Sequence, residues 1–456
     1  MTFDLIHIQL ILMAMLVLGS IIIRIRGARS LQLTFNSALL LSIALIFLLM
    51  DILPVSGTYM NMINANQFSS FMGFLFAFGM LLFNLMAYSY SESYKDLALL
   101  ADFSFIGMYL IASSVSLVTI FVGIELSSIP SIFMILLSKR SIEAAAKFFI
   151  MASISIAILS FAIVMLYGTS NTLALSKYGP GGIIAFVLFL FVAGLSFDAS
   201  VFPFNVLIPD VYQGSGAYIT GMLGGVNKKA GFAAFIQVLV LVFIAYKPAF
   251  EIVALLSLLT MLYGNVVALL QNNLKRLMAY SSISQAGYIL IGIATATAQG
   301  IGASIFQVFA HMFLFIGTLA LLAWLESRNR LEVDELIGLN NENRFAAFAL
   351  SVFLLSLVGL PFTIGFVGKF LLFISAINSG LLWLAIAGII NSAISLFYYA
   401  RIIMAVYANK AHARHLPIDS GVFAVVAVCL VVTIVFGVYP GPIIALADGA
   451  AQYLLP

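Results

Sequence analysis

The chain has 456 residues, of which 8% are Asp, Glu, Lys or Arg and 63% are hydrophobic, and its formal net charge is +3. An ordinary soluble domain is about 25% charged, and no globule can enclose this much apolar surface. With a mean hydropathy of +1.17, the composition predicts a polytopic membrane protein. It excludes a secreted enzyme, a nucleic-acid-binding protein and a disordered chain.

Apolar runs long enough to cross a bilayer follow one another along the whole chain. A transmembrane helix needs about 20 apolar residues, and continuous rather than alternating apolar runs favour helices over a membrane barrel. We interpret the stretch 206–223 as the second half of a span broken at Pro203, which leaves fourteen spans. The other expected limits are 5–23, 33–54, 69–90, 97–113, 115–137, 145–168, 182–204, 226–246, 250–271, 279–297, 299–325, 345–376, 381–408 and 420–440.

The distribution of Lys and Arg supports this count. If the N-terminus lies outside, fifteen of the twenty basic residues fall on cytoplasmic connections or the adjoining span ends, and only Lys177 and Lys247 fall on the other side. Such a bias is the positive-inside pattern, and it predicts that both termini lie on the outer side. The fifteen are Arg24, Arg26, Arg29, Lys95, Lys139, Arg140, Lys147, Lys275, Arg276, Arg328, Arg330, Arg344, Arg401, Lys410 and Arg414.

Two spans contain an interior proline, at Pro203 and Pro361. Proline removes a backbone hydrogen bond, and broken spans in both halves of a membrane protein indicate a transport site. We therefore expect an all-α polytopic membrane protein of about fourteen transmembrane helices with an inverted repeat of five-helix units. The expected parts are an N-terminal three-helix segment (1–96), a first half (97–246), a second half (250–408) and a C-terminal helix (409–456).

Six ionisable residues remain inside apolar spans, where each costs about 2.5–3.5 kcal/mol. Two interpretations are open: ion pairs that lock helices together, or a chain of protonatable groups along a polar axis. Burial lowers the pKa of a lysine and raises that of a carboxylate, so that both kinds of group can exchange protons near neutral pH. The six candidates are Glu125, Asp198, Lys228, Lys229, His311 and Lys369.

Several local sequences are similar to one known family. They are GIELSSIP (123–130), SIEAAAKFF (141–149), FPFNVLIPDVYQGS (202–215), NKKAGFAAF (227–235), NNLKRLMAYSSISQAGY (272–288), GLPFTIGFVGKF (359–370) and NSAISLFYYAR (391–401). The chain resembles the subunit N branch of the antiporter-like membrane subunits of proton-pumping NADH:quinone oxidoreductase (respiratory complex I). This family is shared with multi-subunit cation/proton antiporters and membrane-bound hydrogenases.

The resemblance implies proton translocation coupled to redox chemistry on other subunits, with no redox site or cofactor on this chain. It places the family's fifth-span glutamate at Glu125, its central lysine at Lys228 and its twelfth-span lysine at Lys369. The implied partners are other membrane-arm subunits, the lipid bilayer and protons, without nucleic acid. The implied location is a prokaryotic plasma membrane.

The sequence departs from the family where a lysine normally precedes the first Pro-Phe by five residues, because this position is Asp198. The histidine that usually follows this Pro-Phe is Asn205. Two ionised carboxylates cannot form the usual pair with Glu125. We hypothesise that Lys229 supplies the missing charge by pairing with Asp198 or Glu125; alternatively, it faces a polar cavity without a role. His311 is either a bridge from the central lysine to Lys369 or a helix-packing residue.

Three functions are therefore open: an energy-coupling proton channel of a redox complex, a subunit of a cation/proton antiporter or membrane-bound hydrogenase, and a scaffold that no longer pumps. The local sequences favour the first function, and Glu125, Lys228 and Lys369 argue against the scaffold. The electron donor (NADH, ferredoxin or a deazaflavin) and the quinone acceptor are left open.

Overall fold

The computed structural model describes residues 2–53, 57–59, 62–138, 142–177, 183–409 and 415–455. Four of the basic residues expected on cytoplasmic connections, Lys139, Arg140, Lys410 and Arg414, lie outside these ranges. Within them the chain is almost entirely helical, apart from a short antiparallel hairpin of β1 (Gly57–Tyr59) and β2 (Ile63–Ala65).

The first eight helices carry the N-terminal segment and most of the first half of the chain. They are α1 (Thr2–Arg26), α2 (Arg29–Ile52), α3 (Gln67–Tyr90), α4 (Tyr94–Ala112), α5 (Leu117–Leu136), α6 (Ile142–Ser170), α7 (Ile184–Ala199) and α8 (Ile208–Gly214). One continuous rod then contains α9 (Ala217–Met222), the π-helical turn η1 (Leu223–Asn227), α10 (Lys228–Gln237) and a second π turn, η2 (Val238–Val242).

The remaining helices form the second half and the C-terminal segment. They are α11 (Pro248–Leu269), α12 (Leu274–Ala294), α13 (Ala298–Glu326), the 3-10 turn η3 (Val333–Leu336), α14 (Leu339–Glu342), α15 (Arg344–Val358), α16 (Ile364–Asn378), α17 (Leu382–Tyr407), α18 (Ser420–Val438) and α19 (Gly441–Leu454).

Eleven helices of the described chain are long and apolar enough to cross a membrane. Helix α4 and the broken pairs α7/α8 and α15/α16 complete the fourteen spans that the sequence predicts. One predicted boundary is wrong: residues 206–223 do not form a single half-span, because only α8 belongs to the broken span and α9 opens the next one. Helix α19 was not expected, and it lies against α13 and α3.

Several basic residues outside the buried set gather at one end of the bundle and make contacts there. Lys95 donates to the carbonyl oxygen of Arg24 beside the start of α4, and Arg276 and Lys147 both bind Asp210. We call this end, marked by Arg24, Lys95, Lys147, Lys275 and Arg276, the basic end.

Spans four to eight and nine to thirteen have related arrangements of opposite direction. Helix α4 begins at the basic end, whereas α11 ends there, and the broken span is the fourth of each group. Each group opens with two helices in close contact at glycines. A Cβ at Gly107 of α4 would lie 2.7 Å from the Gly123 carbonyl oxygen of α5, and a Cβ at Gly287 of α12 would lie 2.6 Å from the Met261 nitrogen of α11.

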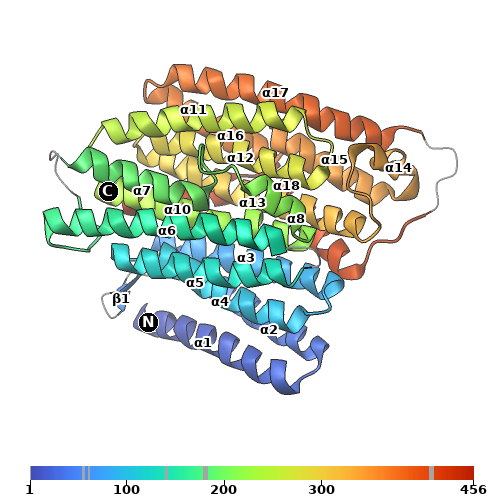
Figure 1. Cartoon of the computed structure of the whole chain (residues 1–456), viewed down its shortest axis with the longest axis horizontal. Helices are drawn as coiled ribbons and strands as arrows, with labels where there is room; N and C mark the ends of the chain where they lie inside the picture. Colours follow the sequence, from blue (N-terminus) through green and yellow to red (C-terminus); the bar gives the residue numbers. More distant parts are fainter. Residues whose placement is uncertain are drawn as a thin grey trace.

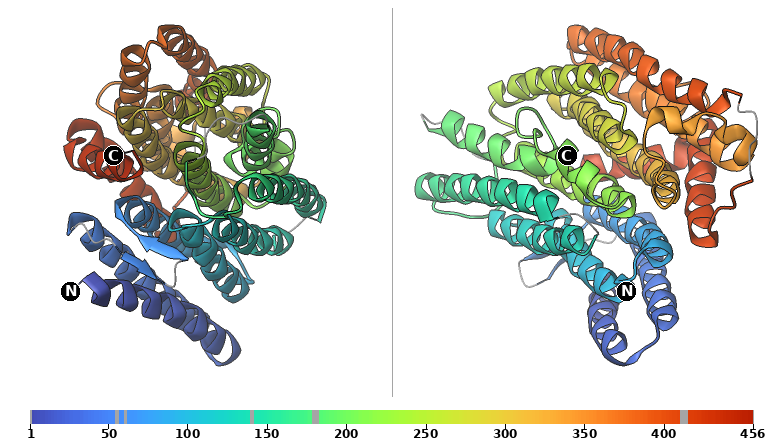
Figure 2. Two further views of the ribbon diagram at one scale, coloured as in Figure 1. Left: turned by 90° about the vertical axis from the view of Figure 1, so that its left-hand side faces the viewer. Right: turned by 45° about the vertical axis from the view of Figure 1, so that its right-hand side comes forward.

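The helices lie side by side, with α1 and α2 at one edge and α17 at the opposite edge (Figure 1). Both views of Figure 2 show the α1–α2 hairpin at the border of the bundle, away from the green and yellow helices of the centre. The apolar windows of α12 and α13 are buried along their whole length, and that of the α9–α10 rod is almost so. Ionisable residues inside these windows are therefore enclosed by other parts of the protein.

Candidate functional site

The second broken span binds a lysine through the backbone that its proline leaves free. In a continuous helix the carbonyl oxygen of Leu357 would accept from the N–H of residue 361, but Pro361 has none. Lys369 of α16 donates instead, with its Nζ 2.9 Å from the carbonyl oxygen of Leu357 and 2.8 Å from that of Val358. Gly359 follows in the left-handed region (φ +99°), which ends α15 there.

Two side chains complete the environment of Lys369. Its Nζ is 2.9 Å from the Ser392 hydroxyl of α17 and 4.2 Å from the centre of the Tyr288 ring of α12. Ser392 also hydrogen-bonds to the Tyr288 hydroxyl at 3.2 Å. A cation–π contact and hydrogen bonds to neutral oxygens can hold an ammonium group in place while leaving it free to lose its proton.

The two neighbouring lysines of α10 point to different helices. Successive residues of an α-helix are about 100° apart, so Lys228 and Lys229 cannot share a partner. Lys228 Nζ donates at 2.9 Å to both the hydroxyl and the carbonyl oxygen of Ser282 on α12. Lys229 Nζ is hydrogen-bonded to His311 Nδ1 of α13 and lies 3.3 Å from the Gly224 carbonyl oxygen.

The hypothesis that Lys229 pairs with Asp198 or Glu125 is therefore wrong. Lys229 faces α13, on the side of the rod turned toward the second half of the chain. None of the ion pairs found among the described residues involves Lys228, Lys229 or Lys369. The interpretation of these lysines as interhelical ion pairs is not supported.

Polar side chains lead from His311 toward Lys369. Gln307 lies one turn before His311 on α13 and donates to the Gln285 side chain at 3.0 Å, and Gln285 in turn donates to the Leu357 carbonyl oxygen at 3.1 Å. Leu357 is also an acceptor for Lys369. A Cβ at Gly368 would lie 2.0 Å from Gln307 Oε1, so glycine at this position lets Gln307 approach α16.

The first broken span carries a carboxylate between two cavities. Asp198 and Glu125 line one cavity of about 180 Å³ between α5, α6 and α7. Asp198 and Lys228 line a second cavity of about 50 Å³. Asp198 Oδ2 is buried without a hydrogen-bond partner among the described residues. Apolar side chains form most of the walls of both cavities, and Asp198 lines both of them, with Glu125 on the first and Lys228 on the second.

The structure thus places the six predicted residues one after another across the bundle, although among the described residues no hydrogen bond joins Lys228 to Lys229 or His311 to Gln307. Their order is Glu125, Asp198, Lys228, Lys229, His311 and Lys369, with Gln307 and Gln285 between the last two. The neutral side chains of this series were not predicted, because the sequence interpretation rested on ionisable residues and left out Ser, Tyr and Gln. The signal for Gln285 was the polar run YSSISQAGY (280–288) inside an expected span, whereas Gln307 lies outside this run. Among the described residues, no group of three or more His, Cys, Asp or Glu suits a metal ion.

Known proteins resemble this chain in both sequence and structure. Residues 114–395 match the family model described as NADH:quinone oxidoreductase/Mrp antiporter, TM. The F(420)H(2) dehydrogenase subunit N of Methanosarcina mazei is 35% identical over 394 residues, which are 80% of this chain and 78% of that protein. The NADH-quinone oxidoreductase subunit N of Bdellovibrio bacteriovorus is 35% identical over 377 residues, 78% of each chain.

Solved structures show the same fold. A chain of respiratory complex I from Thermus thermophilus with bound aureothin is 27% identical, with a TM-score of 0.85 over 96% of this chain and 99% of that one. A chain of the Mrp complex from Dietzia sp. has a TM-score of 0.90 at 19% identity over 98% and 97%, which shows the fold alone. This chain belongs to the NADH:quinone oxidoreductase/Mrp antiporter transmembrane family, alongside the proteins named subunit N.

Proposed function

We propose that the chain is the proton-translocating membrane-arm subunit of a complex I-like quinone oxidoreductase. In this proposal protons move along the series from Glu125 to Lys369, and redox chemistry on other subunits drives them. No cofactor is held by this chain. The basic end faces the cytoplasm of a prokaryotic cell, and both termini lie outside, because basic residues accumulate on the cytoplasmic side of membrane proteins.

The observation that carries this proposal is that the hydrogen-bond partners of Lys228 and Lys369 are neutral. Each ammonium group is buried and is bound by hydroxyl and carbonyl oxygens. A lysine that only joined helices would be expected beside a carboxylate, since an unpaired charge in the membrane interior is costly. A lysine that must alternate between charged and neutral forms needs an environment that accepts both.

A membrane assay tests the role of the two lysines. Lys228→Met and Lys369→Met are expected to abolish proton uptake into sealed inverted vesicles while the complete assembly still forms. Lys247→Met is the matched control, because Lys247 is exposed at the end opposite the basic end. Normal pumping in either of the first two variants would refute the relay.

The second candidate function is a subunit of a cation/proton antiporter or membrane-bound hydrogenase, which the structural similarity to the Mrp complex supports. Gentle solubilisation, native gel separation and mass spectrometry distinguish the two candidates. Iron–sulfur and quinone-site subunits in the band would favour the redox complex, and the accompanying input module would identify the electron donor. Antiporter-type subunits alone would favour the exchanger.

A further inference from the structure

A large cavity opens at the basic end beside the central rod. Its volume is about 900 Å³, and its walls come from the ends of α3, α5, α8 and α13 and the starts of α9 and α12. We call it the vestibule. The titratable groups on its walls are Tyr90, Glu92, Tyr218, Lys275, Glu326, Glu332 and Glu335.

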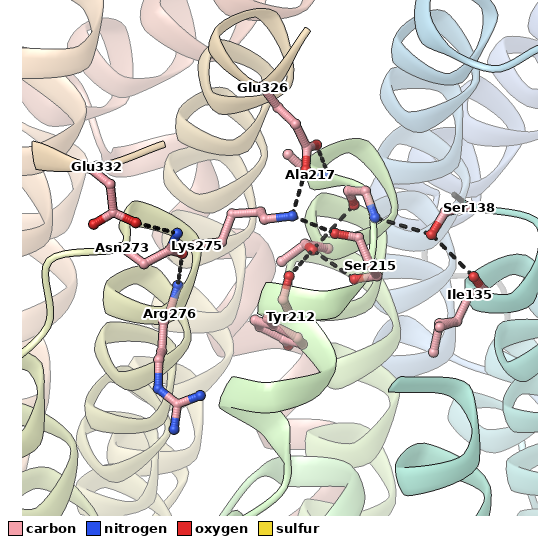
Figure 3. A network of polar contacts seen from close by, with 12 residues as sticks. Ile135, Ser138, Tyr212, Ser215, Ala217, Asn273, Lys275, Arg276, Glu326 and Glu332 are labelled. Carbon is pink, nitrogen blue, oxygen red and sulfur yellow. Dashed lines mark hydrogen bonds and ion pairs between the residues drawn. The ribbon is translucent and has the colours of Figure 1, made fainter. Parts of the chain in front are cut away.

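One ion pair stands at the inner side of the vestibule. Lys275 Nζ lies 2.5 Å from Glu326 Oε1, and the two side chains are 5% and 28% exposed. Both partners also bind the backbone of the short link between α8 and α9, as Figure 3 shows. Lys275 donates to the Ser215 carbonyl oxygen at 2.7 Å, and the Ala217 N–H donates to Glu326 Oε2 at 2.6 Å. The carboxylate thus sits at the start of α9, where the helix dipole favours negative charge.

The α8–α9 link separates the vestibule from the Lys228 site. Ser215 lines the vestibule, and Tyr212, one turn earlier in α8, lines the 50 Å³ cavity together with Lys228 and Asp198. The Thr220 hydroxyl joins the two sides, since it contacts the Ser215 hydroxyl at 3.0 Å and the Tyr212 carbonyl oxygen at 3.1 Å.

This ion pair is expected to contribute little to the stability of the fold. A partly buried pair loses hydration that its mutual attraction barely offsets, and well-packed apolar side chains often serve as well. Here each charge holds one side of the same two-residue gap, Ser215–Gly216, in the wall between two cavities. The Gly216 N–H also donates to the Ser138 hydroxyl at 3.2 Å, so loss of the pair would loosen the link and leave this contact and the rest of the helix contacts in place.

We propose that Lys275 and Glu326 form the gate through which protons reach Lys228 from the vestibule, an inference that rests on the proposed relay. Glu326 accepts a proton from the vestibule, and the neutral carboxyl releases Lys275 and the N–H of Ala217. The α8–α9 link then moves, and Glu326 passes the proton inward to the cavity shared by Tyr212 and Lys228. The carboxylate that this step regenerates pairs with Lys275 again and closes the link.

Thiol labelling tests the closed state. Thr220→Cys places a thiol behind the link at a fully buried position, and Cys429 of α18, the single natural cysteine, is buried elsewhere. In the complete assembly in sealed vesicles, Glu326→Gln is expected to speed reaction of Thr220→Cys with a charged methanethiosulfonate about tenfold, which corresponds to about 1.4 kcal/mol of closing free energy. Cys429 should stay unreactive.

Glu326→Gln leaves the Lys275 ammonium without its carboxylate partner, which destabilises the fold. A second variant without either charge therefore keeps the test valid if Glu326→Gln alone fails to fold. Lys275→Gln combined with Glu326→Gln removes both charges and should give the same acceleration. Glu332→Gln is the control on the vestibule wall, since Glu332 binds Asn273 and not the link. Unchanged labelling in both gate variants, or parallel labelling of Cys429, would overturn the gate.

Passive proton leak separates the gate from the relay. Both gate variants are expected to raise the leak of resting vesicles, and adding Lys228→Met should suppress this increase. A leak that persists with Lys228→Met would overturn the gate. Normal pumping by Lys228→Met alone would instead refute the relay itself, so the two failures give different results.

Discussion

Lys369 takes the hydrogen bond that Pro361 cannot make. The Leu357 carbonyl oxygen, which would accept from an N–H at position 361 in a regular helix, accepts from Lys369 Nζ at 2.9 Å. The proline and the lysine are eight residues apart, yet one frees the Leu357 carbonyl oxygen and the other donates to it. The break in the span is therefore the binding site of the ammonium group.

Restoring the missing donor should weaken this site. In Pro361→Ala the new N–H can bond to Leu357 and compete with Lys369. A hydrogen bond to a charged group contributes about 1.5–3 kcal/mol, so we expect pumping per quinone reduced to fall by roughly tenfold or more. Proton uptake and quinol formation measured together check this, and an unchanged ratio would show that the break has no such role.

The proposed relay requires Lys369 to lose its proton. A substitution that keeps the positive charge but cannot release the proton tests this requirement. Lys369→Arg keeps the charge, but a guanidinium does not deprotonate in proteins. We expect this variant to pump as poorly as Lys369→Met. Ser392→Ala, which removes only one of the three hydrogen bonds to Nζ, serves as the control and should retain most of the activity. Full pumping by Lys369→Arg would show that a fixed charge suffices.

Lys229 and His311 are expected to act as one unit between the two halves. Lys229→Met and His311→Leu should each slow proton transfer, and the double variant should be no slower than the worse single variant. Groups in direct contact give such non-additive effects. The rates of proton uptake in the three variants form the cycle. Additive losses would mean that the two residues work separately.

Position 198 is expected to tolerate the lysine that the family usually has there in place of Asp198. In Asp198→Lys the new ammonium would face Glu125 across their shared cavity of about 180 Å³ and could pair with it. We expect this variant to keep most of the pumping and Asp198→Leu to lose it. Equal pumping by all three forms would exclude position 198 from the relay.

Helix contact at Gly107 gives a prediction about stability. A Cβ there would lie 2.5 Å from the Ser127 nitrogen, and overpacking of this kind costs about 1–3 kcal/mol. Gly107→Ala should therefore lower the thermal unfolding temperature of the purified chain in detergent. Gly168→Ala in α6, where a Cβ meets open space, is the control and should not lower it. Equal melting temperatures would show that α4 and α5 separate easily.

Hydropathy and charge predicted much of this architecture, because insertion into lipid depends on segment composition more than on tertiary detail. Fourteen spans, two proline breaks and a series of buried charges were all expected. The C-terminal helix α19 was not, because its 14 residues begin with Gly-Pro and are too few to cross a bilayer.

The directions in which the buried side chains point could not be predicted from the sequence. Sequence alone places Lys228 and Lys229 side by side, but their partners depend on the phase of the rod, which the π turn η1 changes just before them. Asp198 looked like a lost function because the family usually has a lysine at this position. The cavities on both sides of it are lined by residues from distant helices, which no local sequence pattern contains.

The π turn η1 determines the directions in which the two lysines of α10 point. A π turn contains about one residue more than an α turn, so η1 shifts every later side chain by nearly a third of a revolution relative to α9. If one residue of 223–227 were deleted, the turn could close as a regular α turn, and Lys228 would still face Ser282 and Lys229 would still face His311. Backbone register, as much as residue identity, decides which of the two lysines faces Ser282 and which faces His311.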